Sequence, residues 1–382
     1  MKRLLIGLAV VLILVVGAYL GMSTILYSRL ATIKPNCAGA FPDNTPAAFS
    51  VAQFSDSLDP APYFMPEYET VSIPGRTPDI TLSGWYVPSA GAETGREDRA
   101  VLVVHGLGTG SPDCRRHPRA LLAAGMLHRA GYNVLLIDLR DHGDSTLEDG
   151  RWAGGTEEYL DVLSAWDWLM AEQGFAAEQI GIFAYSGGTG TTLIALGQEP
   201  RIAAIWLDSV FVDIELAIGD ELSRSGLPTF LIPGGLLIAR LNGDDLTAFS
   251  PLEAATRIDG RPVFITHAVG DSALKVDYAY RLADALRAAG AEPELWVTPG
   301  DGHVRSMFEE TAEYERRLIL FFRGWWCGRA SFRDDLALSV VMERLSRLTE
   351  DTCRREIRTP ASRQKDVGTV TVRASWQDAT PL

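Results

Sequence analysis

The first feature of the chain is a long apolar run without charged residues, which extends from residue 4 to residue 28. As a helix with a rise of about 1.5 Å per residue, it would extend for about 37 Å, enough to cross a hydrocarbon core of about 30 Å. We expect residues 1–30 to be a single-pass transmembrane anchor. A cleaved signal peptide and a buried soluble helix are the alternatives.

The charges that flank this run bear on its orientation. Lys2, Arg3 and the free amino group precede it, and Arg29 and Lys34 follow it. This balance favours an N-terminus on the inside. We therefore expect a protein of the cell membrane with its catalytic domain outside the cytoplasm.

Short apolar runs alternate with longer helix-like segments from residue 66 onward. The first two runs, TVSIP and ITLSGWYVP, flank a turn and predict an antiparallel hairpin. The later runs are almost continuously apolar, as in a parallel sheet that is covered by helices on both faces. The expected parallel strands are residues 100–106, 133–140, 180–186, 202–210, 262–269 and 293–300, and the first helices are 117–130, 156–172 and one that begins at Gly187.

Three segments depart from this alternation. Residues 31–65 are rich in Pro, Ala, Ser and Asp and are expected to be a linker or an irregular wrap. Residues 211–261 interrupt the rhythm with helices rich in Leu and Ile, which form either a small lid or ordinary covering helices. The C-terminal extension, residues 327–382, is expected to be partly helical, over 332–357, or disordered.

Composition excludes several classes of protein. Of 382 residues, 47% are hydrophobic and 22% are charged, which argues against a disordered, collagen-like or coiled-coil chain. The net charge of −14 disfavours sequence-independent nucleic-acid binding, which needs a basic face. No two cysteines have CxxC spacing, which disfavours a zinc ribbon or a thioredoxin-type motif. We expect buried or free thiols. Four cysteines also permit three disulfide pairings, among which the sequence does not choose. The cysteines are Cys37, Cys114, Cys327 and Cys353.

Ser186 is the candidate nucleophile. It lies in the sequence AYSGG, at the end of an apolar run and the start of a helix pattern. A serine on a sharp strand-to-helix turn needs small residues two positions before and after it, and Ala184 and Gly188 meet this need, although the first position is usually glycine. The alternative is an ordinary serine in a glycine-rich turn.

Asp271 and His303 each follow the end of a predicted parallel strand. A serine hydroxyl needs a base within hydrogen-bond reach, and the base needs a carboxylate that fixes its tautomer. The carboxyl ends of parallel strands share one edge of the sheet, so these side chains are expected beside Ser186. Asp208 is a rival carboxylate and His142 a rival base.

An HGLG turn follows the first parallel strand. We expect the backbone N–H groups of Leu107 and Gly187 to form an oxyanion hole, where two donors stabilise a tetrahedral oxyanion. His105 in this turn is interpreted as structural. The DLRDHGDS segment after the second parallel strand is interpreted as a polar turn that braces the site.

The segments HGLG, DLRDHGDS, AYSGG, HAVGD and DGH occur in this order, each at a strand end. This order resembles the α/β-hydrolase superfamily, specifically its small-lid serine hydrolases that include the prolyl-oligopeptidase-like branch, over about residues 66–326. The resemblance implies an α/β-hydrolase fold, a catalytic triad of Ser186, His303 and Asp271, and an acyl-enzyme. Asp141 replaces a glycine of the family's second turn and leaves the triad intact.

These features predict a membrane-anchored serine hydrolase that cleaves a small-molecule carboxylic ester or acyl substrate. The alternatives are a thioester hydrolase, an aminopeptidase-like enzyme, and a catalytically silent hydrolase fold that serves as a binding module. An aminopeptidase needs an acidic anchor for the substrate amine, for which Glu215, Asp220 and Glu221 are available. Phosphate-loop, HExxH and EF-hand motifs do not occur, so we expect no cofactor and no metal; the oligomeric state is open.

Overall fold

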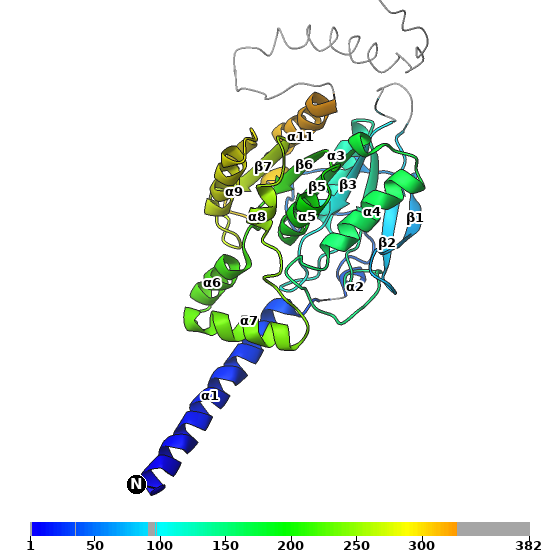
Figure 1. Ribbon diagram of the computed structural model, residues 1–382. Helices are drawn as coiled ribbons and strands as arrows, with labels where there is room; N and C mark the ends of the chain where they lie inside the picture. The colour runs from blue at the N-terminus through cyan, green and yellow to red at the C-terminus, as the bar shows by residue number, and fades with distance from the viewer. Residues whose placement is uncertain (1, 35, 91–95, 97, 327–382) are drawn as a thin grey trace, which may run out of the picture. The chain divides into compact units, whose positions relative to one another are not determined.

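The core of the protein is one eight-stranded sheet (Figure 1). The computed structural model describes residues 2–34, 36–90, 96 and 98–326. The strand order is β1-β2-β4-β3-β5-β6-β7-β8; β1 and β2 form the predicted antiparallel hairpin, β2 pairs antiparallel with β4, and the other pairs are parallel. The strands are β1 Glu69–Pro74, β2 Thr81–Val87, β3 Ala100–Val104, β4 Asn133–Ile137, β5 Ile180–Tyr185, β6 Ala204–Asp208, β7 Val263–Ala268 and β8 Glu294–Thr298.

Helices cover both faces of this sheet. Alternate side chains of a strand point to opposite faces, so in β3 Leu102 belongs to one apolar cluster and Val103 to the other. The first cluster packs α4, α5, α8 and α9 on the sheet, and the second packs α3, α10 and α11. This arrangement confirms the predicted α/β-hydrolase architecture. The helices of these layers are α3 Pro118–Arg129, α4 Tyr159–Ala171, α5 Gly187–Gln198, α8 Pro251–Ala255, α9 Asp277–Ala288, α10 Ser306–Glu309 and α11 Thr311–Trp326, with a 3₁₀ turn, η2, at Ala177–Gln179.

Residues 31–65 wrap around the domain. The segment contains α2 (Cys37–Ala40) and a 3₁₀ turn, η1 (Ala61–Tyr63). Its Phe49 and Met65 are buried in the second apolar cluster, so the segment is a wrap and does not behave as a free linker.

A disulfide joins this wrap to the domain. Cys37 and Cys114 are bonded, with Cα atoms 6.2 Å apart. The expectation of free or buried thiols is therefore wrong for this pair. The two cysteines meet because residues 31–65 bring α2 against the loop after β3, and the number and spacing of the cysteines do not show this. Cys327 and Cys353 lie outside the described residues, as does the whole predicted C-terminal extension.

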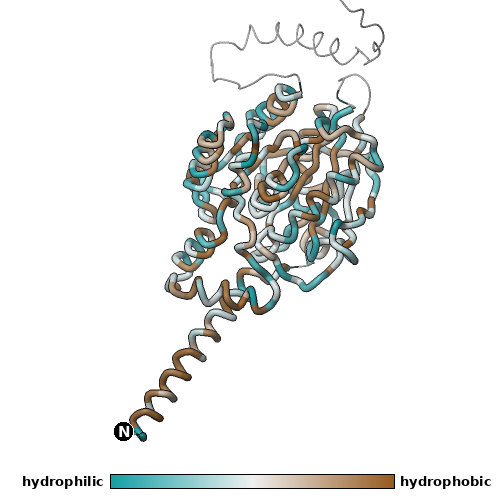
Figure 2. Tube along the Cα trace, viewed as in Figure 1, coloured by the Kyte–Doolittle hydropathy of each residue, from teal (hydrophilic) through white to brown (hydrophobic). Residues whose placement is uncertain are grey.

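Helix α1 (Lys2–Ala31) is, among the described residues, the helix long and apolar enough to cross a membrane. Figure 2 shows its N-terminal part as an almost continuous hydrophobic stretch. Residues 2–18 are exposed throughout, and even Val16 exposes 46% of its surface. A membrane anchor and a signal sequence share this length and apolar character.

The predicted insertion after β6 packs on the C-terminal part of α1. It forms α6 (Ile214–Arg224), the 3₁₀ turn η3 (Thr229–Leu231) and α7 (Ile232–Leu241) before reaching α8. In Figure 1, α7 lies across α1, and the residues of both helices form common apolar clusters. The insertion starts where β6 ends, so it lies at the carboxyl edge of the sheet.

Candidate active site

Ser186 lies at the sharp turn between β5 and α5. Its backbone adopts φ 54° and ψ −132°, a left-handed conformation that is costly for a residue with a side chain. A Cβ at Gly188 would collide with the carbonyl oxygen of His105, and a Cβ at Gly187 would lie 2.8 Å from the Cβ of Leu107. The two glycines are therefore required for this turn to approach the loop after β3. The strained turn presents the Ser186 hydroxyl at the carboxyl edge of the sheet.

The structure brings Ser186, His303 and Asp271 into one hydrogen-bonded chain. Nε2 of His303 lies 2.7 Å from Oγ of Ser186, and Nδ1 of His303 lies 2.8 Å from Oδ2 of Asp271. The three residues follow β5, β8 and β7, whose parallel pairing gathers their carboxyl ends. The sequence assigned these three positions to one site, and their side chains are in direct contact.

These contacts determine how the protons are arranged. An ionised carboxylate can only accept, so Nδ1 of His303 carries a proton and donates it to Asp271. Nε2 of a neutral His303 then accepts from the hydroxyl of Ser186. Burial raises the pKa of the Asp271 carboxyl, but hydrogen bonds from His267 and His303 outweigh burial and hold that pKa well below its usual range. Asp271 thus remains an anion beside the imidazole.

His267 is a supporting residue that the sequence analysis missed. It is fully buried in β7, accepts a hydrogen bond from the Val210 N–H at Nδ1 (3.2 Å) and donates from Nε2 to the Leu274 carbonyl (2.9 Å). The same Nε2 lies 3.4 Å from Oδ2 of Asp271. Oδ1 of Asp271 accepts from the N–H of Ala273 at 2.8 Å. Both carboxylate oxygens are therefore held in place from several directions.

Ser209 is a second residue that sequence reasoning missed. Its Oγ accepts a hydrogen bond from the N–H of Val304 (3.0 Å), the residue after His303. Ser209 and Val304 both have positive φ, at 53° and 51°, so two strained positions meet behind the histidine. The sequence around Val304 carries no signal of this role.

The rival carboxylate, Asp208, is directed elsewhere. It is fully buried at the end of β6, where its Oδ2 accepts from the hydroxyl of Tyr314 at 2.8 Å and its Oδ1 accepts from that of Ser209 at 3.2 Å. Burial raises its pKa to about 6. Asp208 therefore supports α11 and the Ser209 loop, while Asp271 is the carboxylate bonded to His303.

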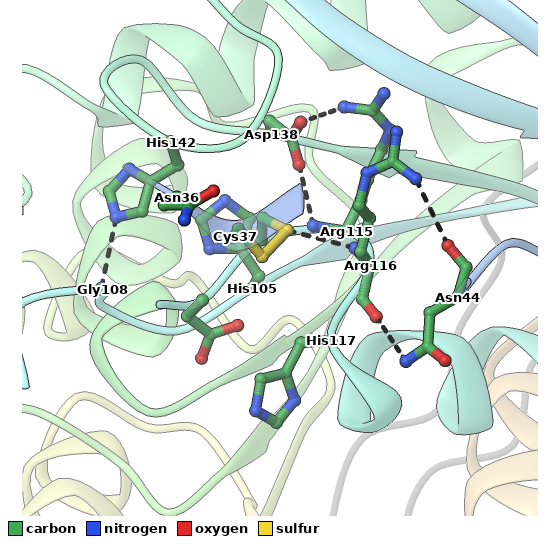
Figure 3. Close-up of a disulfide and its surroundings, with 12 residues drawn as sticks. Asn36, Cys37, Asn44, His105, Gly108, Arg115, Arg116, His117, Asp138 and His142 are labelled. Carbon is green, nitrogen blue, oxygen red and sulfur yellow. Dashed lines mark hydrogen bonds and ion pairs between the residues drawn. A yellow bond between two sulfur atoms is a disulfide. The ribbon is translucent and has the colours of Figure 1, made fainter. Parts of the chain in front are cut away.

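The rival base, His142, is also engaged away from Ser186. Its Nε2 accepts from the N–H of Gly108 (3.2 Å), and its Nδ1 donates to the carbonyl of Arg140 (2.8 Å). Burial lowers its pKa to about 3, so it stays neutral. His142 therefore braces the HGLG turn, as Figure 3 shows with the neighbouring disulfide.

The HGLG turn is held on both sides of Leu107. His105 is buried, donates from Nδ1 to the Gly106 carbonyl and accepts at Nε2 from the N–H of Leu139. The carbonyl of Gly108 accepts from the backbone N–H of Lys34 at 2.7 Å. A Cβ built on Gly187 would lie 3.3 Å from the backbone nitrogen of Leu107, so the turn and the start of α5 lie side by side.

The DLRDHGDS segment forms the polar turn that its composition indicates. Asp141 has φ 62°, a backbone conformation that glycine adopts without strain. In this chain the Asp141 carboxylate accepts N–H bonds from Glu148 (2.7 Å), Asp149 (3.1 Å) and Gly150 (2.9 Å). These bonds offset the backbone strain, and the turn lies beside the site without entering it.

Within the described residues, no cluster of three or more His, Cys, Asp or Glu side chains is arranged to hold a metal ion. The site consists of a serine, a histidine, a carboxylate and backbone amides. Such a set performs nucleophilic acyl transfer from its own side chains.

Comparisons with known proteins agree with this fold. Residues 121–328 match the model of the prolyl oligopeptidase family. The fold is similar to the Pyrococcus furiosus esterase Pf2001 (TM-score 0.56, 22% identity, covering 71% of this chain and 96% of that one). It is also similar to the Pyrococcus horikoshii acylaminoacyl peptidase (TM-score 0.51, 18% identity, covering 72% of this chain and 44% of that one).

A sequence relative adds little to the function. An uncharacterized 31.7 kDa Escherichia coli protein from the traX–finO intergenic region is 26% identical over 108 residues, which are 28% of this chain and 37% of that protein. The chain thus matches little more than a third of that relative's length. The family match, which spans more than half of the chain, is the decisive one. The chain belongs to the prolyl oligopeptidase family and has the α/β-hydrolase fold.

Proposed function

We propose that this protein is a membrane-anchored serine hydrolase that cleaves carboxylic esters through an acyl-enzyme. The observation that carries the proposal is the unbroken contact from Ser186 Oγ to His303 (2.7 Å) and from His303 to Asp271 (2.8 Å). Ser186 attacks the acyl carbon while His303 takes its proton. The imidazolium then protonates the leaving alcohol, and Asp271 stabilises the positive ring. Water repeats the sequence on the acyl-enzyme and releases the acid.

The N–H groups of Leu107 and Gly187 hold the oxyanion in this mechanism. Gly187 is the first residue of α5, whose N-terminus carries partial positive charge. The bonds that His142 and Lys34 make to Gly108 keep the Leu107 amide in place before the reaction begins. Donors arranged in advance stabilise the developing charge without a cost of reorganisation.

The acidic positions of the insertion favour an ester over an aminopeptide substrate. Asp220 pairs with Lys275 at 2.6 Å and accepts a hydrogen bond from Tyr278 at 2.7 Å. Glu221 pairs with Arg29 at 3.2 Å and with Arg224 at 2.6 Å. Both carboxylates are already neutralised, which leaves Glu215, exposed in the first turn of α6, as the remaining anchor.

An aminopeptidase-like activity is nevertheless the second candidate. The family match and the similarity to an acylaminoacyl peptidase favour an amide bond as much as an ester. Both reactions use the same acyl-enzyme, so the site alone does not separate them. Thioester hydrolysis uses it too.

The disulfide supports an extracytoplasmic catalytic domain. Disulfides persist in oxidising compartments, and Cys37–Cys114 is bonded. Together with the charges that flank α1, this bond supports an N-terminus inside and a domain outside. Full-length mass measured on the membrane fraction distinguishes a retained anchor from a cleaved signal, and protease added to cells with a permeable outer barrier should digest the domain. Full protection would reverse the orientation.

The test of the activity uses the full chain in detergent with a fluorophosphonate probe. Wild type and Ser223→Ala should be labelled, because the Ser223 hydroxyl bonds only to a carbonyl of its own helix. Ser186→Ala should be folded and unlabelled. Labelling that persists in Ser186→Ala would remove Ser186 from the mechanism, and absence of labelling in wild type would favour the silent binding module. Matched p-nitrophenyl ester, thioester and aminoacyl anilide substrates then separate the candidate reactions.

A further inference from the structure

Helix α7 crosses α1 at two consecutive glycines. A Cβ on Gly234 would lie 2.8 Å from the ring of Tyr19 and would collide with Oγ of Ser23, and a Cβ on Gly235 would lie 3.2 Å from Leu26. Small residues at a crossing allow two backbones to approach closely, as in helix pairs within membranes. The insertion is therefore fixed to α1 and not merely near it.

The 3₁₀ turn η3 lies at the level of Tyr19. The rings of Tyr19 and Phe230 stack with centroids 6.2 Å apart, and the hydroxyl of Tyr19 donates to the backbone carbonyl of Phe230 at 3.1 Å. Tyr19 is also the first residue of α1 that is not fully exposed.

The length of α1 decides where the bilayer lies. The free apolar part, Leu4 to Ala18, extends for about 22 Å at about 1.5 Å per residue. A hydrocarbon core of about 30 Å needs about 20 residues, so a spanning α1 must include residues 19–23. Those residues are the ones that contact Phe230 and Gly234. Any tilt of α1 increases the length that the bilayer must enclose.

Apart from Thr229 and Arg240, the exposed side chains of η3 and α7 are apolar. Phe230 of η3 and Pro233, Leu237 and Leu241 of α7 are exposed, and the last three lie on one face of α7, opposite the buried Gly235 and Ala239. Phe230 exposes 63% of its surface and Leu241 72%. None of the four is charged. These exposed apolar residues lie next to the crossing with α1, the helix proposed above to be the membrane anchor.

Apolar packing connects α1 and α6 with the loop that carries Leu107. Ile214 of α6 packs against the cluster that contains Leu26 of α1, and both Ile214 and Leu107 pack against the cluster that contains Phe211. Leu107 carries one of the proposed oxyanion amides next to Ser186. Apolar packing is therefore continuous between α1, α6 and the loop next to the nucleophile.

We propose that η3 and α7 lie in the membrane leaflet nearest the domain, and that Ser186 receives esters whose acyl chains reside in that bilayer. The inference rests on the proposed membrane anchoring and serine hydrolase activity. Its partner is the lipid surface, and its substrate class is a membrane-resident acyl ester.

Photolabelling from the lipid phase tests the location of η3 and α7. The full chain is reconstituted in phosphatidylcholine nanodiscs that contain a diazirine-bearing phosphatidylcholine, irradiated and digested with trypsin. We expect label on the peptide of residues 225–240, bounded by Arg224 and Arg240, and on the α1 peptide of residues 4–29. The peptide of residues 276–281, whose Tyr280 exposes 45% of its surface on α9, is the control and should remain unlabelled.

Each labelling outcome has a distinct meaning. Label on α1 but not on residues 225–240 overturns the inference and leaves the anchor intact. No label on α1 overturns the anchor, and with it the inference. Equal label on residues 276–281 means that η3 and α7 are no more lipid-exposed than α9, which also overturns the inference.

A second measurement compares two esters in the same nanodiscs. Phe230→Asp and Leu241→Asp together should lower turnover of p-nitrophenyl palmitate by about tenfold or more, because charge withdraws an apolar surface from lipid. Turnover of p-nitrophenyl acetate and fluorophosphonate labelling should stay within about twofold, as should both substrates in Tyr280→Asp. Loss of both esters would indicate damage to the site, and loss of neither would contradict delivery from the bilayer. Absence of fluorophosphonate labelling in wild type would instead overturn the proposed serine hydrolase activity.

Discussion

His303 and Asp271 are 32 residues apart, yet Nδ1 of His303 lies 2.8 Å from Oδ2 of Asp271, while the other ring nitrogen reaches Ser186. The carboxylate is in turn held by His267 and by the amide of Ala273. One side chain therefore fixes both the orientation and the tautomer of the imidazole. The mechanism proposed here depends on that contact.

Asp271→Asn should preserve the shape of the site and remove the charge. An amide can donate to Nδ1, which would favour the wrong tautomer of His303 and leave Nε2 protonated in the resting enzyme. We expect kcat for a water-soluble ester to fall by about 10³–10⁴-fold. Steady-state kinetics and a melting curve of the same sample provide the measurement. A kcat near that of wild type in a folded Asp271→Asn would assign the carboxylate role elsewhere.

The raised pKa of Asp113 predicts that the stability of the protein depends on pH. It is buried behind the nucleophile turn, bonded to the hydroxyl of Tyr185 at 2.7 Å, and burial raises its pKa to about 7. An unfolded aspartate titrates near about 3.9, so the folded protein binds this proton more tightly. The contribution of Asp113 to stability is fully present below about pH 4 and is lost as pH rises through about 7.

The variant Asp113→Asn stays neutral at every pH. We expect its melting temperature minus that of wild type to increase from pH 4 to pH 7 and then to level off. Asp43→Asn, at an exposed position, should show a constant difference over the same range. A flat difference for Asp113→Asn would contradict the raised pKa.

The disulfide between Cys37 and Cys114 closes a loop with a sequence separation of 77. Loop closure of this size reduces the entropy of the unfolded chain, and a typical contribution is about 2–4 kcal/mol. We expect dithiothreitol to lower the melting temperature of wild type, and Cys37→Ala with Cys114→Ala to melt at that lower temperature without further response to dithiothreitol. A melting temperature in wild type that does not change on full reduction would show that the wrap is held by packing alone.

Two glycines of the insertion make a matched pair. Gly234→Ala introduces a methyl group 2.8 Å from the ring of Tyr19, whereas the methyl group of Gly219→Ala would have its nearest contact, Cδ1 of Ile232, at 3.8 Å. Overpacking should cost Gly234→Ala about 1–3 kcal/mol of local stability. Gly219→Ala lies within α6 and should stabilise it by about 0.5–1 kcal/mol.

Limited proteolysis at Arg224 and Arg240 reports this local stability of the insertion. Cleavage should be faster than wild type in Gly234→Ala and no faster in Gly219→Ala. Equal rates in both variants would mean that α7 does not depend on its close crossing with α1.

The strands and the three central side chains were accessible to sequence analysis for a physical reason. Strands β3, β4 and β5 are buried on both faces, so their residues form uninterrupted apolar runs. Residues that follow such strands must gather at one edge. The turn at Ser186 also carries a local signal, because it requires small residues two positions before and two positions after the serine.

Other features depend on long-range contacts that leave no local pattern. The role of His267 arises from the register of β6 and β7, which brings the Val210 amide to its ring. The choice of Cys114 as the partner of Cys37 depends on the path of the wrap. The docking of α7 on α1 has one signal that was not used, the adjacent Gly234 and Gly235 in an otherwise bulky apolar helix.

Trapping of the acyl-enzyme tests the central claim most directly. Wild type mixed with p-nitrophenyl acetate and quenched in acid within the first turnover is digested with trypsin, and the peptide of residues 152–201 is measured by tandem mass spectrometry. The account predicts an added acetyl group on Ser186, a stoichiometric burst of p-nitrophenol, and neither in Ser186→Ala. An acetyl group on any other residue, or steady turnover with Ser186 unmodified in the quenched samples and undiminished in Ser186→Ala, would contradict it.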